Sequence, residues 1–174
     1  MNAGRDNLVL IGMPGSGKST VGVVLAKQLG KDFVDTDLLI QQAEGYTLQD
    51  IVDRDGYLVL RDIEERVICA LDCRDTVVAT GGSAPYSDHA MQHLKQHGMV
   101  IFLDADLATI TRRIGDYSTR GLARRPDQSL QDLFLERRAL YHRYADHTLA
   151  AGERSQDEIA QAIVKILGRR GESC

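Results

Sequence analysis

The stretch Gly12-Met-Pro-Gly-Ser-Gly-Lys-Ser19 decides the fold of this chain. It fits the pattern G-x-x-x-x-G-K-[ST], whose backbone N–H groups cradle the phosphates of a nucleotide. A short apolar run at 8–11 precedes it, and apolar residues at helical spacing follow it over 19–29. The alternative is a glycine-rich turn without a ligand, but the strand before the loop and the helix after it favour nucleotide binding.

Each part of this loop has an expected task. The backbone N–H groups and the helix N-terminus supply positive potential to phosphate oxygens. The Lys18 ammonium can reach the terminal phosphates, and the Ser19 hydroxyl can ligate Mg²⁺. We therefore expect the nucleotide to be bound by Gly15, Ser16, Gly17, Lys18, Ser19 and Thr20.

Short apolar strands alternate with helical patterns along the rest of the chain. Besides 8–11, we expect strands at 33–35, 77–80, 99–103 and 148–149. Besides 19–29, we expect two or three helices within 38–70 and further helices at 88–97, 107–114, 130–144 and 156–167. This alternation predicts βαβ units, a parallel sheet and, at this length, a single α/β domain over residues 1–174.

The composition argues against several classes of protein. The net charge of −4 is unlike that of a general nucleic-acid binder, and no apolar run approaches the ~18 residues of a membrane span. The polar stretch 1–7 lacks the apolar segment of a signal peptide, and three cysteines do not make a disulfide framework. We expect a cytoplasmic protein without nucleic-acid or membrane partners. We expect a monomer, because no apolar stripe is left over once helices cover the sheet.

Charge is placed unevenly along the chain. From 112 to 143 there are eight arginines against four acidic residues, in a protein that is acidic as a whole. A local basic segment suggests an anionic ligand such as a phosphate. Without a pocket, a solvated helix face is the simpler explanation.

Polar residues follow three of the expected strands. In parallel sheets ligands bind beyond the carboxyl ends of the strands, so the loop at 12–20, Asp35 with Asp37, and Gly81-Gly82-Ser83 are expected to converge on one crevice. One of the two carboxylates can hold Mg²⁺ and the other can accept a substrate proton. The alternative is a helix N-cap followed by a surface acid. The neighbouring loop favours the functional interpretation.

Two further groups of residues lie on predicted helices. Arg61 and Glu64 share a helical face, so Glu64 could hold the Arg61 guanidinium ready for an anionic substrate. Alone, such a pair is usually a surface ion pair of little consequence. His89, His93 and His97 also share a face, but without acidic or cysteine neighbours we favour a solvated surface over a metal site.

Together these motifs resemble those of one family. The loop, Phe33-Val-Asp-Thr-Asp37, Leu60-Arg61-x-x-Glu64, Ala79-Thr-Gly-Gly82, Arg120 and Arg137-x-x-x-Tyr141 have the order and spacing found in shikimate kinases. They cover most of the chain. The resemblance implies the three-layer P-loop kinase fold of the nucleoside monophosphate kinase-like group. That fold has a five-stranded parallel sheet flanked by helices, a mobile lid at about 115–126 and substrate-binding helices at about 38–70.

The resemblance also implies an activity and a set of roles. A shikimate kinase uses ATP and Mg²⁺ to phosphorylate the 3-hydroxyl of shikimate, a step of aromatic amino-acid biosynthesis. In this sequence Asp37 would bind the substrate hydroxyls and act as the base, and Asp35 would organise Mg²⁺ with Ser19. The remaining roles would fall to Arg61, Arg137 and Gly82 for the substrate, Arg113 for the adenine, and Arg120 as the lid arginine at the phosphates.

The sequence departs from the family pattern near the acceptor. Ser83 replaces a glycine, Gly121 replaces the proline after Arg120, and Tyr57 and Leu60 replace a glutamate and a phenylalanine. We expect Gly121 to make a looser hinge. These changes leave open a kinase for another small hydroxylated carboxylate. A regulatory nucleotide-binding module without catalysis is a third hypothesis. Against it stand the retained side chains of Lys18, Ser19, Asp35 and Asp37.

Overall fold

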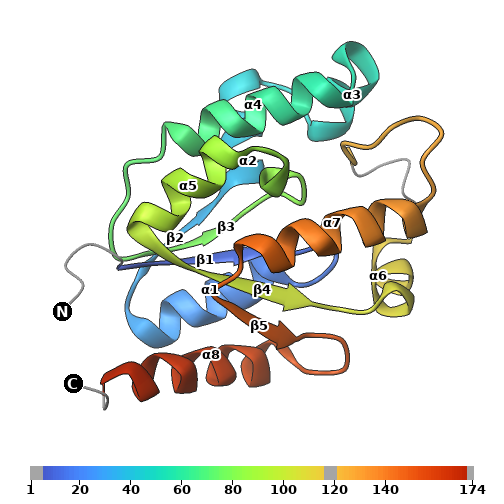
Figure 1. The fold of residues 1–174 in the computed structure, drawn as a ribbon. Helices are drawn as coiled ribbons and strands as arrows, with labels where there is room; N and C mark the ends of the chain where they lie inside the picture. The colour runs from blue at the N-terminus through green and yellow to red at the C-terminus, as the bar shows by residue number, and fades with distance from the viewer. Residues whose placement is uncertain (1–5, 116–120, 172–174) are drawn as a thin grey trace.

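Five parallel strands form the sheet at the centre of the molecule (Figure 1). The computed structural model describes residues 6–115 and 121–171, with the backbone alone at 169–171. The strand order is β2-β3-β1-β4-β5, and every neighbouring pair is parallel. The bounds are β1 Asn7–Ile11, β2 Asp32–Asp35, β3 Thr76–Ala79, β4 Gly98–Asp104 and β5 His147–Ala150. The predicted parallel sheet is confirmed.

Helices cover both faces of the sheet and complete the three layers (Figure 1). On one face lie α1 (Lys18–Leu29) and α8 (Gln156–Gly171), which pack against each other. On the other face lie α4 (Tyr57–Cys69), α5 (Asp88–His97) and α7 (Leu130–Tyr144). The remaining helices are α2 (Thr36–Glu44), α3 (Leu48–Asp55), α6 (Leu107–Ile114) and the short 3₁₀ helix η1 (Ala84–Tyr86), which the sequence analysis did not predict.

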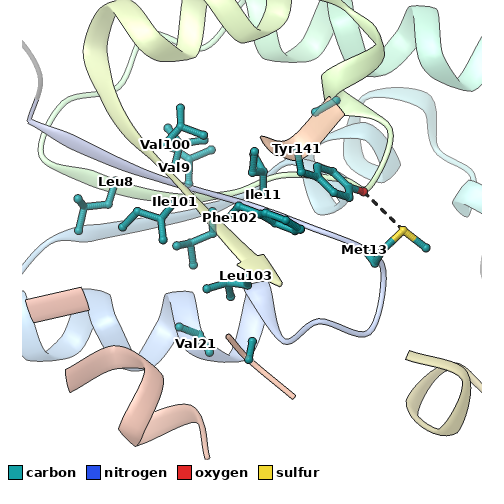
Figure 2. Packing of buried hydrophobic residues seen from close by; sticks show 14 of the residues in the cluster. Leu8, Val9, Ile11, Met13, Val21, Val100, Ile101, Phe102, Leu103 and Tyr141 are labelled. Atoms are coloured by element: carbon teal, nitrogen blue, oxygen red, sulfur yellow. Dashed lines mark hydrogen bonds between the residues drawn. The ribbon is translucent and has the colours of Figure 1, made fainter. Parts of the chain in front are cut away.

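The core explains why the strands are continuous apolar runs. β1 lies between β3 and β4 with helices on both faces, so all five of its residues are buried. Figure 2 shows Val9 and Ile11 of β1 among the buried side chains of β4. The Tyr141 hydroxyl, from α7, contacts the Met13 sulfur at 3.8 Å and donates a hydrogen bond to the Gly82 carbonyl at 2.7 Å. Tyr141 thus links α7 to the ends of β1 and β3.

A second, smaller core holds the helices that follow β2. Ile40 of α2, Ile51 of α3 and Ile63 of α4 pack together, and Ala123 joins them from a segment far along the chain. The segment that begins at Gly121 therefore packs against α2, α3 and α4 through Ala123. Within the described part of the chain, no helix is both long and apolar enough to span a bilayer.

Candidate functional site

The three polar strand ends meet at one cavity of about 640 Å³. The loop after β1, Asp37 after β2 and Gly81-Gly82-Ser83 after β3 all line it, as the parallel arrangement predicted. Arg113 and Arg137 line it too, so the basic segment 112–143 faces a pocket through these side chains and not only solvent. The solvated-face interpretation of that segment is therefore incomplete.

The loop after β1 presents donors to this cavity. Helix α1 begins after Gly17, which provides no side-chain cap for the first N–H groups. The Ser16 hydroxyl is buried and has no hydrogen-bond partner among the described residues. Uncapped N–H groups at a helix N-terminus form an anion site. The geometry therefore suits a phosphate.

Lys18 is buried in the same loop. Its ammonium donates hydrogen bonds to the carbonyls of Gly12 and Met13, both at 2.9 Å. Burial lowers the pKa of Lys18 to about 8, and the carboxylates of Asp37 and Asp35 oppose this shift. A bound phosphate would stabilise the charged form further, because an opposite charge close by favours ionisation.

Ser19 and Asp35 lie side by side. The Ser19 hydroxyl donates to Asp35 Oδ2 at 2.5 Å, while Asp35 Oδ1 accepts a hydrogen bond from the Asp37 backbone N–H at 3.0 Å. Asp35 is therefore also the N-cap of α2, so the structural and functional interpretations apply to the same residue. A hydroxyl and a carboxylate oxygen this close fit Mg²⁺, which prefers oxygen ligands completed by phosphates and water.

Asp37 and Glu64 bring two carboxyl groups together deep in the cavity. A Cβ at position 81 would collide with Glu64 Oε1 and lie 2.6 Å from Asp37 Oδ1, so this approach requires Gly81. Burial raises the pKa of Asp37 to about 6, although Lys18 opposes the shift. Burial, and then the charge of Asp37, raises the pKa of Glu64 to about 7. When one of two carboxyl groups this close is ionised, its negative charge disfavours ionisation of the other.

Glu64 does not hold Arg61, so that prediction is wrong. Glu64 is 3% exposed and accepts a hydrogen bond from the Ser83 hydroxyl, which a glycine at position 83 would not offer. Its second oxygen, Oε1, is buried and has no partner in the described part of the chain. Arg61 instead lies over the ring of Tyr86, with its Cζ 3.4 Å from the ring centroid.

Arg61 and Arg137 converge, although 76 positions separate them in the sequence. Arg61 Nη2 donates to the Ala123 carbonyl at 3.0 Å, and Arg137 Nη2 donates to the same oxygen at 2.9 Å. Both Nε atoms are buried without a hydrogen-bond partner among the described residues. Gly82 lies directly beside this pair, because a Cβ there would stand 2.7 Å from Arg137 Nη1. Two guanidinium groups that share one acceptor form an arrangement suited to a carboxylate.

Gly121 is held firmly, so the expectation of a loose hinge is wrong. Its φ is +58°, and its N–H donates to Gln49 Oε1 of α3 at 2.6 Å. Proline fixes φ near −65° and has no N–H, so it cannot occupy this position in this conformation. Any side chain would also meet the backbone of residues 48 and 49. Gly121 thus fastens this end of the expected lid to α3.

The other predicted lid and nucleotide residues are only partly described. Arg113 donates to the carbonyls of Gly15 at 3.3 Å and Gly152 at 2.8 Å, which places it beside the loop. Arg120 and the rest of 116–120 lie outside the described residues. Arg154 and Gln156 also line the cavity, and sequence reasoning missed both because no motif marks them.

The histidine face has no sign of a metal site. His93 Nε2 lies 2.7 Å from the Leu71 carbonyl, and the rings of His93 and His97 meet edge to face. His89 Nδ1 lies 3.8 Å from a carboxylate oxygen of Glu65. No cluster of three or more metal-ligating side chains occurs among the residues that the structure describes. His93 is therefore partly buried and not simply solvated.

Sequence comparison identifies relatives over nearly the whole chain. Residues 14–168 match the family described as shikimate kinase. A shikimate kinase from Gloeobacter violaceus is 41% identical over 168 residues, which cover 94% of this chain and 93% of the relative. One from Synechococcus sp. is 40% identical over 169 residues, which cover 95% and 87%.

Solved structures agree with this result. Shikimate kinase from Acinetobacter baumannii in complex with shikimate superimposes with a TM-score of 0.87 at 31% identity, over 94% of this chain and 93% of that one. Shikimate kinase from Aquifex aeolicus superimposes with a TM-score of 0.80 at 30% identity, over 95% and 98%. More distant kinases, such as a thymidylate kinase from Candida albicans at 14% identity and a TM-score of 0.57, share the fold alone.

Proposed function

The chain belongs to the shikimate kinase family, and we propose that it transfers the γ-phosphoryl group of ATP to the 3-hydroxyl of shikimate. One observation carries the acceptor side of this proposal. Arg61 and Arg137 aim their Nη2 donors at a single oxygen, at 3.0 and 2.9 Å, beside the cavity that holds Lys18 and Asp37. Phosphate donors and carboxylate donors therefore lie around one space.

Asp37 acts as the proton acceptor in this proposal. Its side chain lines the same cavity as the phosphate-binding loop and Arg137, where a substrate hydroxyl would meet it. With a pKa of about 6, Asp37 is mostly ionised at neutral pH, and its pKa lies close to that pH. A general base is most effective in that range.

The loop supplies most of the charge stabilisation. Lys18 would leave the carbonyls of Gly12 and Met13 to bind the β- and γ-phosphates, since an ammonium binds phosphate oxygens more strongly than neutral carbonyls. Ser19 and Asp35 would hold Mg²⁺, which, when bound, offsets the negative charge of the phosphates. Arg113 would lie against the adenine, at the side of the loop where it contacts Gly15.

The lid contributes the last parts of the proposal. Arg120 would touch substrate and phosphate where the lid, at about 115–126 and fastened to α3 at Gly121, covers the site and excludes water, which otherwise hydrolyses ATP. We further propose a single-domain monomer that works in the cytoplasm on a small-molecule substrate, without a nucleic-acid or membrane partner.

A second acceptor follows from one observation. The Ser83 hydroxyl donates to one oxygen of Glu64, and the buried second oxygen, Oε1, has no partner among the described residues, so a different hydroxylated carboxylate that reaches it could use it as an acceptor. A coupled assay of ADP release with ATP alone, with shikimate and with shikimate methyl ester separates these possibilities. Shikimate-dependent turnover supports the proposal. Turnover that is equal with ATP alone would refute it, and turnover that is equal with the ester would show that the arginine pair does not bind a carboxylate.

A further inference from the structure

The arginine pair lies around an aromatic ring that no motif marks. The Tyr86 ring centroid is 3.4 Å from Arg61 Cζ and 5.6 Å from Arg137 Cζ. Tyr57 adds a second ring, 5.1 Å from Arg61 Cζ. All these distances are within the ~6 Å at which a guanidinium is attracted to an aromatic face. Tyr86 is thus the ring that both cations share.

A ring supports a guanidinium differently from a carboxylate. A glutamate beside Arg61 would accept its N–H donors and cancel most of its charge. A stacked ring attracts the cation through its face and leaves the in-plane N–H groups free. The Ala123 carbonyl accepts the two Nη2 donors, and both Nε atoms have no hydrogen-bond partner in the described ranges. Both arginines therefore keep an unpaired N–H donor, although the Glu136 carboxylate partly offsets the charge of Arg61.

Tyr86 is itself held by the helix that carries Arg137. Its hydroxyl donates a hydrogen bond to Glu136 Oε1 of α7, so the ring is fixed from that side. Glu136 Oε2 also accepts from Gln128 Nε2 at 3.0 Å, which anchors the carboxylate in turn. η1 places Tyr86 just beyond Gly82, at the edge of the site. The ring is therefore a fixed surface and not a chance neighbour.

We propose that Tyr86 is a positioning residue whose ring holds Arg61 and Arg137 for the carboxylate of the acceptor without accepting their in-plane donors. The inference rests on the proposed function, since it assigns the arginine pair to a substrate carboxylate. It also specifies the acceptor. Because the ring holds the two guanidinium groups in place, an anion with a planar carboxylate should bind more tightly than its neutral ester.

Two substitutions separate the ring from the hydroxyl. Tyr86→Leu removes the ring, and Tyr86→Phe keeps the ring but loses the hydrogen bond to Glu136. We expect Tyr86→Leu to raise the Kd and KM for shikimate about tenfold, with kcat and the KM for ATP changed less than about twofold. Tyr86→Phe should stay within about threefold of the wild-type Kd, because the stack survives. The preference of the wild type for shikimate over its methyl ester should shrink in Tyr86→Leu only.

A matched control lies on the surface. Arg54 Cζ lies 4.3 Å from the centroid of the Tyr46 ring, and Tyr46 is not among the residues that line the cavity. Tyr46→Leu therefore removes a similar stack and should leave the Kd for shikimate unchanged. Tyr86→Leu combined with Arg61→Lys should weaken binding less than the product of the single effects, because Tyr86 acts through Arg61. Fully multiplicative effects, or equal losses in Tyr86→Phe and Tyr86→Leu, would overturn the inference.

Two further measurements keep the test decisive. If Tyr86→Leu fails to fold by thermal melting, Tyr86→Met offers a second ring-free side chain with the same expected loss. Calorimetric Kd values do not depend on turnover. A wild type that binds shikimate through Tyr86 but does not phosphorylate it would refute the proposed function and support this inference. A wild type that does not bind shikimate overturns both.

Discussion

The two halves of the cavity are built in different ways. The nucleotide side, residues 12–20 with Arg113, comes mostly from one unbroken stretch of chain and offers mainly backbone donors. The proposed acceptor side has Glu64, Ser83 and Arg137 in the cavity wall with Arg61 and Tyr86 behind them; it comes from three separate helices and a loop, and it offers side chains. A contiguous backbone site is fixed by its local sequence. A site assembled from distant side chains depends on which neighbour each one meets.

The departures from the family pattern lie on the acceptor side of the cavity and not on the nucleotide side. On the acceptor side, an altered residue has an altered partner: Ser83 holds Glu64, Tyr57 lies beside Arg61, and Gly121 meets Gln49. The arginine pair is kept, while residues near it differ from the family pattern. On the nucleotide side the pattern G-x-x-x-x-G-K-[ST] is intact.

The largest effect on activity is expected at Lys18, which supplies the one side-chain charge of the phosphate-binding loop. Lys18→Ala should remove measurable phosphoryl transfer, because no other side chain of the loop supplies a charge to the β- and γ-phosphates. The fold should survive, since charged Lys18 is destabilised by burial. Coupled assays and thermal melting test this together. Normal turnover in a folded variant would contradict the assignment of the loop.

Substitution of Asp37 distinguishes a role on the acceptor side from a role on the nucleotide side. Asp37→Asn keeps the shape of the side chain but removes the proton acceptor, so we expect kcat to fall by about 10²–10⁴. Asp62→Asn, an exposed acid on α4, is the control and should be neutral. A loss confined to ATP affinity would move Asp37 from the acceptor to the metal site.

The arginine pair tests the acceptor side by itself. Arg61→Lys and Arg137→Lys keep the charge but lose the planar fork, so each should raise the KM for shikimate about tenfold, or about 1.4 kcal/mol. The KM for ATP should hardly change. Arg66→Lys, at an exposed ion pair with Glu44, serves as control. Equal use of shikimate and its methyl ester by the wild type would show that the pair does not bind a carboxylate.

The last effect concerns Glu64 and is measured as stability, not as activity. Its pKa rises from an ordinary 4.5 to about 7 on folding, so the folded state holds the proton more tightly than the unfolded state. Wild-type stability should therefore fall as pH rises through that range, by up to ~3 kcal/mol at ~1.4 kcal/mol per unit. Glu64→Gln should lack this loss, and its melting temperature should gain on the wild type by several degrees between about pH 5 and about pH 8.

A parallel dependence of wild type and Glu64→Gln on pH would contradict the raised pKa. Ser83→Ala is the informative companion variant, because it removes the hydrogen bond that favours the ionised form of Glu64. The pH-dependent loss in Ser83→Ala should therefore be larger than in the wild type.

The sequence predicted the elements well and the side-chain partners less well. Helix α5 has the predicted bounds, and the strands fit to within one or two residues, because period and glycine stops are local signals. The pairing of Arg61 with Glu64 was wrong, because position 83, distant in sequence, decides which way Glu64 turns. Tyr86 was missed for the same reason: stacking leaves no spacing signal in a sequence.

The Ala123 carbonyl has an evolutionary consequence. It accepts from both arginines, so in the proposed function the carboxylate of the acceptor would compete with an atom of the protein itself. Every residue type carries this oxygen, so no point mutation can delete it. Substitutions at position 123 or in the small core around it can only shift the position of this oxygen, and such a shift changes the affinity for the acceptor. Selection on affinity therefore acts here through packing, and a homologue can retune its substrate binding while both arginines stay unchanged.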